Sequence, residues 1–62
     1  MKNQILSLHK AIADNGGIIP PELVPYADLL KAILKVAKIF TNDEIDEYID
    51  AIIAAIDLLE KS

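Results

Sequence analysis

The stretch that decides the fold is residues 26–40, YADLLKAILKVAKIF. At about 100° per residue, its apolar side chains fill roughly 140° of an α-helix circumference. One neighbouring helix cannot cover so wide an arc, so we expect this helix to lie in the middle of a bundle, with partners on two sides. The arc consists of Leu23, Tyr26, Leu29, Leu30, Ile33, Leu34, Ala37 and Phe40, and Val36 widens it.

Two flanking segments supply the expected partners. Residues 2–14 have a narrow apolar face of helical period, and the following Gly16 and Gly17 suit a left-handed helix end. Residues 42–60 have a second apolar face, formed by Ile45, Tyr48, Ile49, Ile52, Ile56 and Leu59. We therefore predict an all-α fold in which two long antiparallel helices, about 25–40 and 42–60, pack with a short N-terminal helix, about 2–14. Residues 1–62 form a single helical domain.

The connections between these helices have local signals of their own. Pro20, Pro21 and Pro25 predict a short helical turn over 21–24 and a long helix that restarts with Pro25 at its first position. Ile18 and Ile19 are expected to cover the end of the core. Thr41 and Glu44 fit a capping box, with Phe40 and Ile45 placed as a hydrophobic staple. In the core itself, we expect Ile33 and Ile52 to lie near the centres of the two long apolar faces.

Composition limits the possible functions. The 62 residues carry a net charge of −4 and no cysteine, so neither a disulfide nor a thiolate metal site is available. Residues 1–41 carry five lysines and three acids, whereas residues 42–62 carry one lysine and seven acids. This distribution argues against direct nucleic-acid binding. No apolar run has the length of a membrane span, and His9 and Lys10 interrupt the first one, so we expect a cytoplasmic protein.

Residues suited to catalysis or metal binding are scarce. His9 is the only histidine, and Ser7 and Asp14 project away from it on a helix. Asp43, Asp46, Glu47 and Asp50 have helical spacing and lack the glycine of a calcium loop. We therefore expect no enzymatic activity, no metal site and no cofactor.

Surplus apolar residues point to assembly. Ile53 falls among Asp46, Asp50 and Asp57 on a helical projection, and Leu58 and Ile39 also lie outside the expected core faces. Lys31, Lys35 and Lys38 form a row that can pair with these acids, within the bundle or between protomers. All nine residues are candidate interface residues.

These residues predict a protein–protein interaction or assembly module that self-associates, with a dimer favoured over an unknown protein partner. One alternative is an acidic decoy or inhibitor whose last helix occupies a basic groove of a partner. A second alternative is an amphipathic protein of the membrane surface, because residues 27–40 combine lysines with a broad apolar face.

Overall fold

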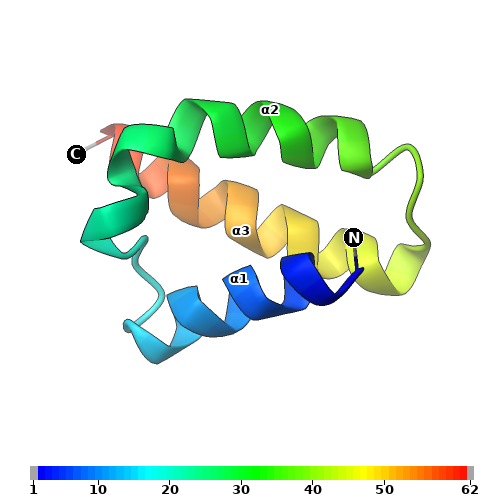
Figure 1. Cartoon of the computed structure of the whole chain (residues 1–62), viewed down its shortest axis with the longest axis horizontal. Coiled ribbons are helices and arrows are strands. Elements are labelled where there is room, and N and C mark those ends of the chain that lie inside the picture. Colours follow the sequence, from blue (N-terminus) through cyan, green and yellow to red (C-terminus); the bar gives the residue numbers. More distant parts are fainter. Residues whose placement is uncertain (1, 62) are drawn as a thin grey trace.

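The computed structural model describes residues 2–61, which contain three α-helices and one 3₁₀ helix (Figure 1). Helix α1 spans Lys2–Asp14, the 3₁₀ helix η1 spans Pro21–Tyr26, α2 spans Ala27–Ala37 and α3 spans Asp43–Lys61. No strand occurs in this range. The prediction of a small all-α domain is confirmed, including the antiparallel pairing of the last two helices (Figure 1).

The central helix is α3, not α2. Both α1 and α2 pack against α3, but no Cα atom of α1 lies within 8 Å of one in α2. The expectation that residues 26–40 form the middle helix is therefore wrong. With 19 residues, α3 is long enough to support both neighbours, whereas α2 has only 11. The wide apolar arc of α2 consequently has a helix on one side only.

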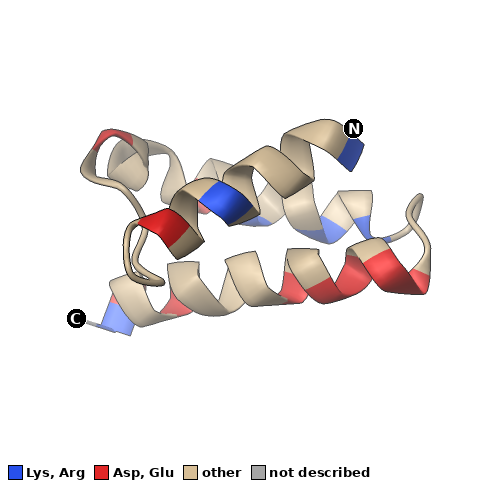
Figure 2. Cartoon of the chain, turned by 90° about the horizontal axis from the view of Figure 1, so that it is seen from below, with Lys and Arg blue, Asp and Glu red and all other residues tan. Residues whose placement is uncertain are grey.

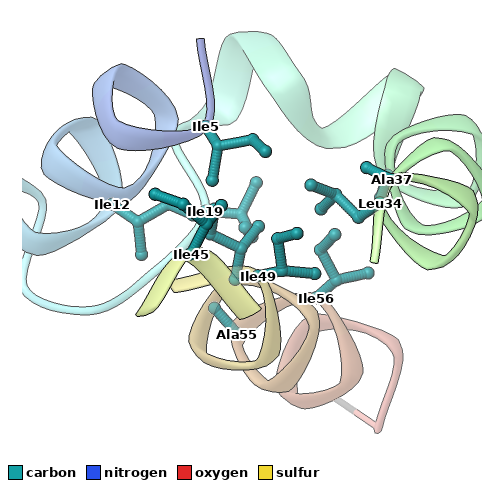
Figure 3. Close-up of a cluster of buried hydrophobic side chains, with 11 residues drawn as sticks. Ile5, Ile12, Ile19, Leu34, Ala37, Ile45, Ile49, Ala55 and Ile56 are labelled. Carbon is teal, nitrogen blue, oxygen red and sulfur yellow. The ribbon is translucent and has the colours of Figure 1, made fainter. Parts of the chain in front are cut away.

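The core lies where α1 and α2 meet α3 (Figure 3). Ile49, Ile52 and Ile56 of α3 are completely buried. Ile52 confirms the predicted core position, but Ile33 is 54% exposed and was assigned to the core wrongly. The other buried residues of the cluster are Ile5, Ile12, Ile19, Ala27, Leu34, Ala37, Ile45 and Ala55.

The end of α1 forms as its glycines predict. The Gly17 N–H donates to the Ile12 carbonyl at 2.9 Å and the Gly16 N–H to the Ala13 carbonyl at 3.1 Å, which is the Schellman pattern. Gly16 and Gly17 have φ of 75° and 80°, where a Cβ is unfavourable. Of the two isoleucines that follow, Ile19 is buried in the core as expected, whereas Ile18 is exposed.

The proline segment interrupts the helix later than predicted. Pro25 lies inside η1 and the α-helix begins at Ala27, because Pro25 has no N–H for an α-helical bond. At the other end α2 stops at Ala37 rather than Phe40. The Phe40 N–H donates to the Ala37 carbonyl at 2.9 Å, a bond of turn spacing that leaves the Phe40 ring in solvent.

The first turn of α3 is capped differently from the predicted capping box. The N-cap is Asn42, whose Oδ1 accepts the Ile45 N–H at 3.1 Å. Thr41 instead donates its hydroxyl proton to Asp46 Oδ1 at 2.5 Å. Phe40 is exposed and Ile45 buried, so the expected staple between them does not form. The shift by one residue leaves Glu44 without its predicted capping role.

Candidate interaction surface

An exposed apolar stripe runs along α2 and into the turn that follows it. Leu29, Ile33, Val36 and Phe40 are 59%, 54%, 56% and 73% exposed, respectively, and we call these four residues the α2 stripe. Leu29, Ile33 and Val36 are spaced by four and three residues, which places them on one face of α2 as in a coiled-coil seam, and Phe40 extends this surface from the turn after the helix. Within residues 2–61, neither α1 nor α3 covers this face.

A hollow beside the stripe lies between α2 and α1. This α1–α2 groove measures about 450 Å³ and is lined on the α2 side by Ala32, Ala37 and three stripe residues. On the α1 side it is lined by Gln4, Ile5 and Leu8. Among the described residues that line it, none is charged and Gln4 alone has a polar side chain. The groove and the stripe form one continuous apolar surface.

The lysine row of α2 lies on a different side and pairs with α3. Lys31 Nζ lies 2.6 Å from Asp57 Oδ1 and 3.0 Å from Glu60 Oε1, and Lys38 Nζ lies 2.7 Å from Asp50 Oδ1. The sequence left open whether these lysines pair with acids of the same bundle or of another protomer, and these contacts lie within the bundle.

The hydrogen bonds of these pairs perturb the titration of their members. The bond from Lys31 lowers the pKa of Asp57, and the bonds to Asp57 and Glu60 raise the pKa of Lys31. The bond to Asp50 raises the pKa of Lys38 in the same way. Three further acids of α3, Asp43, Glu44 and Glu47, are exposed, and Figure 2 shows that the acids are concentrated in the first half of this helix.

Ile53 has a structural explanation that its sequence context concealed. It is partly buried and packs against the core, between Asp50 and Asp57, whose carboxylates both reach lysines of α2. Ile53 therefore faces α2. The carboxylates of Asp50 and Asp57 on either side of it extend past the contact between the helices and bind the ammonium groups of Lys38 and Lys31. Its expected exposure is not observed, and an interface role for Ile53 stays a prediction.

The remaining candidate residues are scattered. Ile39 is 77% exposed in the turn after α2, while Leu58 is 66% exposed on α3. Leu58 borders a second hollow of about 250 Å³ between α1 and α3. Lys35 is exposed, and Asp46 is held by Thr41. The structure thus brings Lys31 and Lys38 together with Asp57 and Asp50, but leaves the other candidates apart from these pairs.

Chemical groups for catalysis or metal binding do not converge in the described part of the chain. The His9 ring contacts the Tyr48 ring edge to face, with centroids 4.9 Å apart, and so links α1 to α3. Residues 2–61 contain no group of three or more acidic, histidine or cysteine side chains placed to hold a metal ion. Within the same residues, no helix combines the length and hydropathy needed to cross a bilayer.

Sequence reasoning missed the α2 stripe as a surface, although the signal was present. The four-three-four spacing is typical of helices that pair with another helix. The lysine row marks the side that faces the acidic α3, so the stripe had to point elsewhere.

Comparison with protein-family models, with curated proteins and with solved structures gives no match.

Proposed function

We propose that this protein is a non-catalytic assembly module that self-associates through the α2 stripe and the α1–α2 groove. The observation that carries the proposal is a continuous apolar surface with no charged residue among those that line the groove. Exposed apolar patches of this kind mark interaction sites on small proteins.

The size of the surface supports reversible association. A half-exposed aliphatic or aromatic side chain leaves on the order of 100 Å² accessible, so the four stripe residues present roughly 400 Å². With the α1 wall of the groove, two copies would bury about 1,000 Å², a size typical of weak, reversible complexes.

The internal ion pairs favour this proposal over the two alternatives. Asp50, Asp57 and Glu60 already bind lysines of the same chain, which leaves fewer free carboxylates for an acidic decoy. The same bonds occupy Lys31 and Lys38, two of the lysines that would attract an anionic membrane. The proposal also includes a cytoplasmic location, which has the sequence pattern near His9 as its support.

Molar mass measured by light scattering across a concentration series tests the proposal. We expect the mass of the wild type to rise above that of a monomer with concentration, and Ile33→Glu to abolish the rise by placing a charge on the stripe. Leu58→Glu is the matched control, because Leu58 is equally exposed but lies on α3 outside the stripe.

A wild type that stays monomeric at high micromolar concentration would contradict self-association. Equal loss of association in both glutamate variants would assign the effect to charge rather than to the stripe. Flotation with anionic liposomes then decides whether the same face binds a membrane surface instead.

A further inference from the structure

We infer that the partner of the α2 stripe is a second copy of this chain, bound about a two-fold axis that passes between Ile33 and Val36, with the two α2 helices antiparallel. This inference rests on the proposed self-association and adds its orientation and register. A two-fold dimer must use the same patch on both copies, so the patch has to complement itself.

An antiparallel pair suits the stripe better than a parallel one, because it sets the largest side chain of each copy beside a smaller one. With the axis between Ile33 and Val36, Ile33 lies at the level of Val36 of the partner subunit, and Leu29 at the level of Phe40 of the partner subunit. All four stripe residues of each copy then meet an apolar residue. In a parallel pair, Phe40 would meet Phe40 of the partner subunit, and Leu29 would meet Leu29 of the partner subunit. The two large rings would then share one layer, and the layers formed by the smaller side chains would be loosely packed.

Small residues flank the stripe at matching levels. Ala32 and Ala37 both line the groove, and the same axis places Ala32 at the level of Ala37 of the partner subunit. Such small side chains let two helices approach closely. Each α2 can therefore enter the α1–α2 groove of the other copy, and the two α2 helices become the centre of a larger bundle with an α1 on either side.

Charge does not oppose this arrangement. A chain with a net charge of −4 would repel its own copy if acids bordered the contact, but the described residues that line the groove are all uncharged. Asp50, Asp57 and Glu60 lie at the α2–α3 contact, where lysines neutralise them. The single polar group in the groove, the Gln4 amide, is exposed and can keep its contact with water.

Disulfide trapping tests the register, and the absence of native cysteine makes every introduced thiol unique. We expect a mixture of Leu29→Cys and Phe40→Cys to form mixed dimers rapidly under mild oxidation, while neither variant alone does so. In the proposed dimer two copies of residue 29 are offset by about 16 Å along the helix axis, and a disulfide needs Cα atoms about 4.4–6.8 Å apart. Intact mass spectrometry distinguishes the mixed product from either homodimer.

Two controls complete the experiment. A mixture of Ile33→Cys and Val36→Cys probes the inner layer while leaving Leu29 and Phe40 intact. This second mixture still reports the register if the substitutions at Leu29 and Phe40 weaken association. Leu58→Cys gives the rate of random collision from an exposed site outside the stripe.

Rapid homodimers of Leu29→Cys and of Phe40→Cys alone would overturn the inference in favour of parallel pairing. Trapping of both mixtures no faster than Leu58→Cys, with a wild type that is a dimer by mass, would overturn the inference and leave the proposed function standing. A monomeric wild type would overturn both.

Discussion

Helices α2 and α3 both carry a broad apolar face, but only that of α3 is covered. On α3, Ile49, Ile52 and Ile56 are completely buried between two neighbours, while on α2 the stripe residues Ile33 and Val36 stay more than half exposed. The apolar content of a helix therefore does not set its place in a bundle. The place of a helix depends on its length and on how many helices pack against it. Helix α2, with a neighbour on one side only, retains an apolar face on which another molecule can pack.

The strongest test of this difference in burial is the same substitution, isoleucine to alanine, on both helices. Ile52→Ala removes a completely buried side chain and should lower the free energy of unfolding by about 2–5 kcal/mol. Ile33→Ala removes a half-exposed one and should cost less than about 1 kcal/mol under conditions where the chain is monomeric. Urea unfolding followed by circular dichroism measures both. Equal losses would mean that α2 is covered as fully as α3.

A smaller effect is expected at the start of α3. Asn42→Ala removes the side chain that accepts the Ile45 N–H and should cost about 1 kcal/mol. Thr41→Ala is the matched control, because Thr41 bonds to the Asp46 side chain and not to a backbone amide of the first turn. Urea midpoints that fall further for Thr41→Ala than for Asn42→Ala would restore Thr41 as the N-cap.

The smallest effect concerns the ion pairs that hold α2 to α3. Lys31→Gln removes the partner that lowers the pKa of Asp57, so the variant should have a slightly lower urea midpoint than the wild type at neutral pH. Lys10→Gln is the control, since Lys10 forms no salt bridge within residues 2–61 and does not contribute to the lowered pKa of Asp57.

The pH dependence of this difference has a definite sign. A carboxyl whose folded pKa is lowered stabilises the fold above its ordinary value of 3.8, and this contribution is lost as pH falls through the folded pKa. Lys31 has a raised pKa, so its contribution is present below the ordinary value of 10.5 and is lost as pH rises beyond it. The midpoint difference should therefore be largest between these values. A difference that persists at strongly acidic pH would contradict the ion-pair explanation.

Local features of the fold could be read from the sequence because their free energies depend on a few neighbouring residues. The helix over 2–14 and its glycine end match α1 and its Schellman bonds, and the helix over 42–60 matches α3 within one residue at each end. The errors at Pro25 and Thr41 are also local, and each displaces a helix boundary by only one or two residues.

Periodicity alone determined that three helices form and which face of each is apolar. It did not determine that α3 would lie between the others, that Ile53 would pack beneath α2, or that Ile33 would remain in solvent. Those outcomes depend on which helices meet, because burial is shared between surfaces far apart in the chain. A helical projection shows how much apolar surface a helix presents, and only the packed structure decides which part of it another helix covers.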